Sequence, residues 1–322
     1  MREEYTYAVA RIRAMEVNLF SKEVVDQLIA CQTYEQCLQL LEEKGWGDGA
    51  LQKDMEGILA REEEKIWDVV RELGIPLERF DVLMYPKLFH NLKAAIKEVC
   101  TEETNHQIFY ENGMVMGKEM LTLVRERRFE ELPEVLQEVA REAYESLLHT
   151  RDGQLCDIMI DKATLEAICQ AGKETKEPVI REYAESYVAV ANIKVAVRSA
   201  KTGKSLDFME KAMTDCEGIR WERLAKAALA GIEGICEYLQ ETSYSQGAEV
   251  LRQSMSAFER WCDNRIIETM KSQKYEAFTL GPVVAYVIAR QNEIRTVRMV
   301  LSGKQNRLPE ESIRERIREM YV

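Results

Sequence analysis

The sequence predicts an all-α protein built from three related helical modules, and two observations lead to this prediction. Valine and isoleucine recur at three- and four-residue spacing almost everywhere, and no segment alternates apolar and polar residues as a half-buried strand does. The pattern Asn-x-x-x-x-(Ile/Val)-(Lys/Arg) also occurs three times, at Asn91, Asn192 and Asn292, which lie 101 and 100 residues apart (192 − 91 and 292 − 192). We therefore expect one compact domain over residues 1–322, with repeats centred near residues 91, 192 and 292.

The composition limits the class of function. The chain has 322 residues, of which 46% are hydrophobic and 31% charged, so it can bury a core. Its net charge of −12 disfavours binding to nucleic acid, which requires an excess of clustered Lys and Arg. The longest apolar run, 280–289, is about half of the ~20 residues that span a bilayer. Residues 1–18 contain no apolar segment typical of a secretory signal, so we expect a cytoplasmic protein.

Neither a metal nor a cofactor is predicted. His90, His106 and His149 are too few and too far apart in the sequence to indicate a zinc site. The cysteines form no C-x-x-C pair and most lie on apolar helical faces, so they are interpreted as reduced core thiols: Cys31, Cys37, Cys100, Cys156, Cys169, Cys216, Cys236 and Cys262.

Local signals place the first helix boundaries. Thr33 and Gln36 form a capping box that opens a helix over 34–43, and Gly45 and Gly47 end it. Glycine, proline and small polar residues predict breaks at 43–50, 73–81, 149–154, 171–178, 200–205 and 278–282.

Two prolines indicate later helix starts. Pro133 and Pro309 each occupy a plausible first helical position, and the segments that follow them, 134–148 and 310–322, are expected to be helical. None of the predicted breaks is a long flexible linker.

Each copy of the repeat carries an apolar stripe on a helix, with basic residues on its flank. The stripes are Leu92, Ala95, Ile96 and Val99, then Ile193, Ala196, Val197 and Ala200, and then Ile294, Val297 and Leu301, where Glu293 replaces an apolar residue. The flanking bases are Lys93, Lys97, Lys194, Arg198, Arg295 and Arg298. Like charges four residues apart cost a helix a few tenths of a kcal/mol, so we expect acidic residues elsewhere in the fold to pair with them. A single such pair is typical of a solvated helix face, whereas the threefold recurrence suggests a shared role.

No catalytic residue can be assigned. The segment "GKS" at 203–205 resembles the end of a phosphate-binding loop, but that motif requires a glycine where Arg198 stands and a strand where a helix is predicted. A helix C-cap with Gly203 in the left-handed conformation is the better interpretation. The sequence also lacks the G-x-S-x-G and H-E-x-x-H motifs.

Four segments, in order, resemble the family of the V-type ATPase C subunit, also called the AC39 or d subunit. They are "YTYAVARIRAMEVNLFSKEVVDQLIACQTYEQCLQLLEEKGWG", "FHNLKAAIKE", "VANIKVAVRSAKTGK" and "LGPVVAYVIARQNEIRTVRMVLSGKQNRLPEESIRERI". Together they extend over nearly the whole chain.

The resemblance implies a funnel of three helical modules around a pseudo-threefold axis, without a catalytic centre. It further implies a central-stalk rotor component that couples the membrane ring of c/K proteolipids to the shaft formed by the D and F subunits during transport of protons or sodium ions. Such a component is peripheral on the cytoplasmic face of the membrane. On this interpretation the six flanking bases, Lys93, Lys97, Lys194, Arg198, Arg295 and Arg298, are candidate partner-binding residues. The alternative is a helical protein-binding scaffold outside a rotary ATPase, and a nucleotide-hydrolysing enzyme ranks third.

Overall fold

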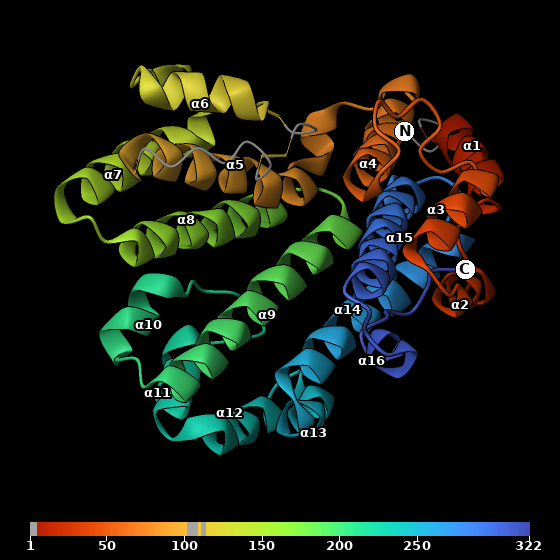
Figure 1. Cartoon of the computed structure of the whole chain (residues 1–322). Coiled ribbons are helices and arrows are strands. Elements are labelled where there is room, and N and C mark those ends of the chain that lie inside the picture. The colour runs from red at the N-terminus through yellow and green to blue at the C-terminus, as the bar shows by residue number, and fades with distance from the viewer. Residues whose placement is uncertain (1–4, 102–108, 111–113) are drawn as a thin grey trace. The chain divides into compact units, whose positions relative to one another are not determined.

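The computed structural model describes residues 5–101, 109–110 and 114–322. Within these ranges the regular secondary structure is entirely helical, which confirms the predicted all-α class (Figure 1). The chain divides into two compact units, the first containing residues up to Leu77 together with 177–179 and 253–322, and the second containing 78–176 and 180–252. The expected single domain and its threefold axis stay predictions.

The first unit is organised around one long buried helix, α15. Its elements are α1 (Thr6–Glu16), α2 (Lys22–Ala30), α3 (Tyr34–Glu43), α4 (Met55–Glu72), α14 (Met255–Lys271), the 3₁₀ helix η4 (Ser272–Tyr275), α15 (Gly281–Gln305) and α16 (Glu310–Arg314). Helix α15 packs against α1, α2, α3, α4, α14 and α16. A helix covered on so many sides must be apolar nearly all round, and residues 281–289 of α15 are all buried.

The second unit contains the other helices. They are the 3₁₀ helix η1 (Leu77–Phe80) at the boundary, α5 (Asp81–Thr101), α6 (Gly117–Arg125), the 3₁₀ helix η3 (Phe129–Glu131), α7 (Glu134–Thr150), α8 (Gly153–Glu174), α9 (Pro178–Thr202), α10 (Leu206–Ala212), α11 (Trp221–Leu229), α12 (Gly231–Gln240) and α13 (Ser245–Gln253). Helices α5, α7 and α8 lie side by side, and α6 packs on α5 (Figure 1).

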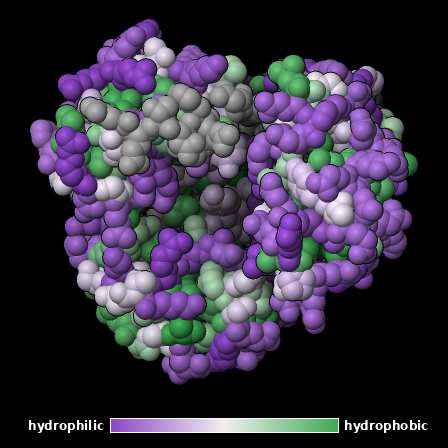
Figure 2. All heavy atoms as spheres, viewed as in Figure 1, coloured by the Kyte–Doolittle hydropathy of each residue, from purple (hydrophilic) through white to green (hydrophobic). Residues whose placement is uncertain are grey.

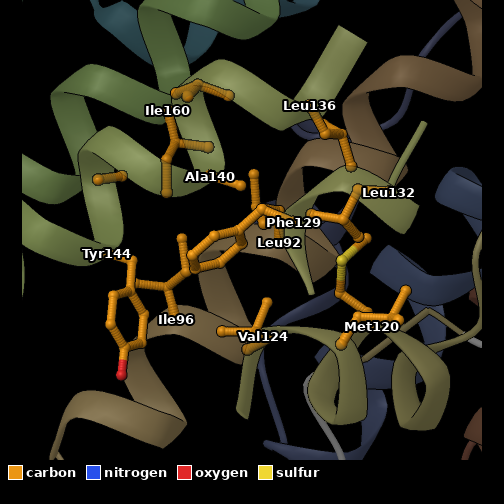
Figure 3. Close-up of a cluster of buried hydrophobic side chains, with 14 of the residues drawn as sticks. Leu92, Ile96, Met120, Val124, Phe129, Leu132, Leu136, Ala140, Tyr144 and Ile160 are labelled. Atoms are coloured by element: carbon orange, nitrogen blue, oxygen red, sulfur yellow. The ribbon is translucent and has the colours of Figure 1, made fainter. Parts of the chain in front are cut away.

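The core of this helical stack is continuous and apolar. Leu92 and Ile96 of α5 meet Met120 and Val124 of α6, and Phe129 fills the space between them and α7 (Figure 3). Leu92 and Ile96 belong to the apolar stripe of the first repeat, so its inward orientation is confirmed. The side chains exposed on the visible face are mainly hydrophilic, with apolar ones scattered among them (Figure 2).

The predicted boundaries at α3 are confirmed. The Gln36 N–H donates to Thr33 Oγ1 at 3.2 Å, while Gln36 Oε1 accepts from the Gln32 N–H at 2.8 Å. After Glu43 the chain turns back, and Gly45 adopts a φ of +78° that favours glycine. The Trp46 N–H then donates to Leu41 O at 2.9 Å, which closes the helix end.

The prediction for the C-terminal segment is wrong beyond Arg314. Helix α16 ends there, and residues 317–322 are not helical. The reason is that the backbone of Glu319 bonds two asparagine side chains, Asn292 and Asn264, instead of the backbone of a helix. Pro133 and Pro309 also occupy the N-cap position, one residue earlier than predicted.

Candidate functional site

The repeated asparagine has the same structural role in all three copies. Asn91, Asn192 and Asn292 lie near the middle of α5, α9 and α15, and all three are buried. A buried amide needs hydrogen-bond partners, and each of these side chains bonds the backbone of a segment farther along the chain. We call these three contacts the asparagine clamps.

The first clamp binds the segment that precedes α6. Asn91 Nδ2 donates to Tyr110 O at 2.7 Å and to Val115 O at 3.3 Å, and Asn91 Oδ1 accepts from the Tyr110 N–H at 2.8 Å. The Tyr110 ring also meets His90 edge to face, with 4.9 Å between ring centroids.

The second clamp repeats the two-way exchange. Asn192 Nδ2 donates to Thr214 O at 2.7 Å, and Asn192 Oδ1 accepts from the Thr214 N–H at 3.2 Å. Thr214 follows α10, so the clamp ties the connection between α10 and α11 to the long helix α9. The Glu185 carboxylate of α9 extends this contact by accepting from the N–H groups of Glu217 and Gly218.

The third clamp divides the same task between two asparagines. Asn292 Nδ2 donates to Glu319 O at 2.9 Å, whereas the Glu319 N–H donates to Asn264 Oδ1 at 2.8 Å. The three copies therefore share a long helix, a buried amide and a clamped segment. Reasoning from charge singled out the basic flank and missed the asparagine, although its constant place in the pattern was the available signal.

The basic residues of the first copy form ion pairs within the protein. Lys93 and Lys97 of α5 pair with Asp161 and Asp157 of α8, the second pair at 2.6 Å. The expectation that acidic residues elsewhere in the fold pair with these lysines is confirmed for this copy. Ion pairs with this degree of exposure contribute at most about 1 kcal/mol each, so they brace α5 against α8 only modestly.

The basic residues of the third copy are paired in the same way, and the second copy differs at Arg198. Arg295 lies 3.2 Å from Asp263 of α14, and Arg298 contacts Glu56 of α4 at 2.5 Å. In the second copy the Arg198 side chain is exposed and forms no ion pair with any described residue, and Lys194 beside it is half-buried. Of the six candidate partner-binding residues, Arg198 is thus the one whose charge the described part of the protein leaves uncompensated.

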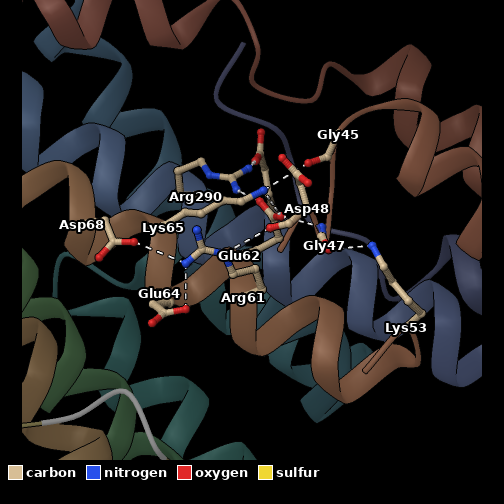
Figure 4. Close-up of polar contacts among 11 residues, drawn as sticks. Gly45, Gly47, Asp48, Lys53, Arg61, Glu62, Glu64, Lys65, Asp68 and Arg290 are labelled. Atoms are coloured by element: carbon tan, nitrogen blue, oxygen red, sulfur yellow. Dashed lines mark hydrogen bonds and ion pairs between the residues drawn. The ribbon is translucent and has the colours of Figure 1, made fainter. Parts of the chain in front are cut away.

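A buried charge cluster lies on α15 beside the third clamp. The Arg290 guanidinium donates to Glu62 of α4 at 2.5 Å and to Glu293 one turn along its own helix. All three side chains are at least nine-tenths buried. Lys65 also donates to Glu62, at 2.7 Å, so Glu62 has two basic partners (Figure 4). Glu293 therefore interrupts the apolar stripe because it is a partner of Arg290.

The cluster holds two loops against α15. Glu293 accepts from the Phe20 N–H in the connection between α1 and α2, and Glu62 accepts from the Gly47 N–H at 2.8 Å. The Phe20 and Trp46 rings stack with centroids 4.8 Å apart, and the guanidinium of Arg290 lies over Trp46 at 5.1 Å. Trp46 is therefore a core residue.

Further side chains, two from α4 and one that precedes it, hold the loop of Gly47. Lys65 donates to Gly45 O and Arg61 to Asp48 O, both at 3.1 Å, and Lys53 donates to Gly47 O at 2.9 Å (Figure 4). Gly47 itself has a φ of +70°, and a Cβ there would approach Ile58 Cγ1 to 2.8 Å, so only glycine fits.

Burial is the largest influence on the pKa of Glu293. It raises the pKa of Glu293 to about 7, although Arg290 and the Phe20 N–H both favour the charged form. A charged pair in such surroundings costs desolvation that its attraction offsets only when every hydrogen bond is made. The bonds of the cluster all run to other parts of the first unit, so its role is to join helices and loops.

The part of the chain that the structure describes contains neither a metal-binding cluster nor a phosphate loop. No group of three or more His, Cys, Asp or Glu side chains there could hold a metal ion; His106 lies outside the described residues. Gly203 has a φ of +65° and the Lys204 N–H donates to Ser199 O at 3.0 Å, which confirms a helix C-cap in place of a phosphate loop. Among the described helices, none has both the length and the apolar character needed to cross a bilayer.

Comparisons with known proteins all indicate the same family. The family model for the ATP synthase (C/AC39) subunit matches residues 8–316. The C subunit of a V-type sodium ATPase from Enterococcus hirae is 23% identical, with 99% of each chain covered. The C subunit of an A-type ATP synthase from Methanocaldococcus jannaschii is 25% identical over 96% of this chain and 85% of the relative. The C subunit of a V-type ATP synthase from Thermus thermophilus is 22% identical over 98% and 99%. These matches confirm the resemblance that the four quoted segments predict.

Proposed function

Because this chain belongs to the ATP synthase (C/AC39) subunit family, we propose that it is a non-catalytic central-stalk rotor component of a V-type ATPase or ATP synthase. In this role it couples the proteolipid ring to the central shaft of the D and F subunits on the cytoplasmic face of the membrane. The observation that carries the proposal is the family match over residues 8–316.

The physical properties of the chain suit a part that transmits torque. Close-packed helical interiors have low compressibility and pass strain on without dissipating it in loose motion. Here the connections between helices are also tied down, by the three asparagine clamps and by the buried charge cluster. Such ties oppose the bending of loops under load.

Isolation from native membranes tests the proposal. A tagged copy of the chain is recovered in mild detergent, and the proteins that accompany it are identified by mass spectrometry. We expect the ring proteolipid together with the D and F subunits. A chain that stays in the soluble fraction, or that brings down only proteins unrelated to a rotary ATPase, would favour the protein-binding scaffold.

The basic pair of the second copy is the sharpest probe of partner contacts. We propose that Lys194 and Arg198 face carboxylates of the shaft or the ring, because the exposed Arg198 has no ion-pair partner among the described residues. The double substitution Lys194→Glu with Arg198→Glu should weaken binding to the rest of the rotor by roughly tenfold or more and reduce its dependence on salt. Binding is measured by reconstitution at low and at raised salt.

A matched control separates position from charge. Lys173→Glu with Lys176→Glu makes the same change in net charge at two exposed lysines of the same unit, outside the repeat. We expect this control to bind almost as the unmodified chain does. Equal binding by both double variants would show that Lys194 and Arg198 only solubilise the helix.

A further inference from the structure

Two cysteine side chains meet at the corner between α2 and α3. Cys31 is the C-cap of α2, and Cys37 lies in the second turn of α3. Cys37 Sγ donates to Leu28 O at 3.3 Å, and Cys31 Sγ donates to Gln27 O at 3.4 Å. These two carbonyls are consecutive in the last turn of α2, so both sulfurs lie at the same end of that helix.

The two thiols differ in access. Cys37 is wholly buried, whereas Cys31 is partly exposed, so a reagent from solution reaches Cys31 first. Burial raises the pKa of the Cys37 thiol to about 12, and the adjacent Cys31 adds to the rise. Cys37 is therefore protonated at neutral pH.

We propose that Cys31 and Cys37 form a reversible dithiol–disulfide modification site whose reaction partner is a low-molecular-weight disulfide. The Cys31 thiolate attacks one sulfur of the reagent and releases one thiolate, which leaves a mixed disulfide on Cys31. Cys37 loses its proton to solvent and attacks the Cys31 sulfur, which expels the second thiolate. The two cysteines lose two electrons and two protons, and the reagent is reduced to two thiols.

The bond would change a corner that supports α15. It would close the short loop of residues 31–37 and replace both S–H donors at the end of α2, while Leu28 O keeps its bond from the Cys31 N–H at 3.3 Å. The same end of α2 is fixed to α15 by Lys304, whose Nζ donates to Ile29 O at 2.5 Å. Oxidation would thus stiffen the place where α2, α3 and the C-terminal part of α15 meet. This chemistry is independent of assembly into a rotary ATPase.

The chain contains a matched control pair. Cys169 is partly exposed and Cys216 is buried, as in the proposed site. Their thiols donate to carbonyls four residues apart, Cys169 Sγ to Asp215 O at 3.4 Å and Cys216 Sγ to Ile219 O at 3.5 Å, whereas those of Cys31 and Cys37 donate to consecutive carbonyls of one helical turn. Exposure alone would make the two pairs equally reactive, whereas the geometry favours only Cys31 and Cys37.

The experiment treats the reduced full chain with oxidised glutathione under native conditions, blocks the remaining thiols and maps disulfides by mass spectrometry without reduction. We expect a Cys31–Cys37 cross-link in preference to Cys169–Cys216. Closure should accelerate by about tenfold per pH unit in the neutral to mildly alkaline range, because Cys37 must first lose its proton. Cys37→Ser should stop at a glutathione adduct on Cys31, and Cys31→Ser should leave Cys37 unmodified.

Two results would overturn the proposal. One is a glutathione adduct on Cys31 that persists in the unsubstituted chain without closing, and the other is cross-linking of Cys169 with Cys216 to the same extent. Circular dichroism verifies that the variants fold. The cross-link in the unsubstituted chain decides the question even if Cys37→Ser does not fold.

Discussion

Glu293 is a buried carboxyl group of the first unit whose protonation changes with folding. Its carboxylate is buried on α15, where Arg290 and Tyr286 of the same helix, Glu62 of α4 and the Phe20 N–H act on it. Burial raises its pKa to about 7 from an ordinary value of 4.5, so the folded state binds the proton more readily than the unfolded state. The contribution of this group to the free energy of unfolding therefore grows as pH falls from about 7 towards 4.5.

Replacing Glu293 with Gln removes this proton linkage and keeps a hydrogen-bonding side chain. We expect the difference in free energy of unfolding, unsubstituted chain minus variant, to be larger at about pH 5 than at about pH 8, by roughly 1 to 3 kcal/mol. Urea unfolding followed by circular dichroism across that range measures it. A difference that does not change with pH would mean that Glu293 stays ionised throughout.

The sequence indicated this residue only as an irregularity. Glu293 was visible as a charge where the first two copies have Leu92 and Ile193. Glu62, the other carboxylate that Arg290 binds, is far away in the sequence, and nothing local connects it with Glu293. Periodicity reports which face of a helix is buried, but it contains no information about which distant helix packs there.

The ends of individual helices were easier to predict than the helices that pack against them. Thr33, Gly45 and Gly203 act on the backbone within a few residues, so the ends of α3 and α9 follow from local chemistry. The segment after Arg314 was mispredicted because its helical pattern competes with two side chains from other helices, Asn292 and Asn264. Tertiary hydrogen bonds prevailed over local propensity there.

Arg290 links α15 to α4, two helices that are far apart in the sequence. Replacing Arg290 with Met leaves Glu62 and Glu293 buried without their shared cation, which typically costs about 3 to 5 kcal/mol. We expect amide hydrogen exchange to accelerate at Phe20 and Gly47, whose N–H groups depend on these two carboxylates. Urea unfolding together with hydrogen exchange measures both effects.

Arg298 supplies the control on the same helix. It pairs with Glu56 at the surface, where both side chains are largely exposed, so Arg298→Met should cost less than about 1 kcal/mol. A loss for Arg290→Met as small as that for Arg298→Met would contradict the role of the buried cluster. Restoration of stability by adding Glu62→Gln and Glu293→Gln to Arg290→Met would support it.

Over the whole chain, the three copies of the repeat share the same kind of contact between a long helix and a connecting segment. The long helices α5, α9 and α15 each carry a buried asparagine that bonds a later segment, although the clamped segments differ in sequence and in distance along the chain. A repeat preserved in this way suggests that each module needs its own tie between helix and connection. The flanking charges vary more, since the bases of the first and third copies pair with acidic residues, whereas Arg198 of the second copy forms no ion pair with a described residue.

Alanine substitution of each asparagine tests this equivalence. Asn91→Ala and Asn192→Ala remove both a donor and an acceptor from a buried backbone segment, and each should cost about 1 to 3 kcal/mol in free energy of unfolding. Asn292→Ala should cost less, because Asn264 keeps the Glu319 N–H satisfied. Combining Asn292→Ala with Asn264→Ala should then raise the cost into the range of the other two copies. If Asn292→Ala alone were the most damaging of the three, the clamps would not be equivalent, and the threefold pattern in the sequence would reflect ancestry without a common mechanical role.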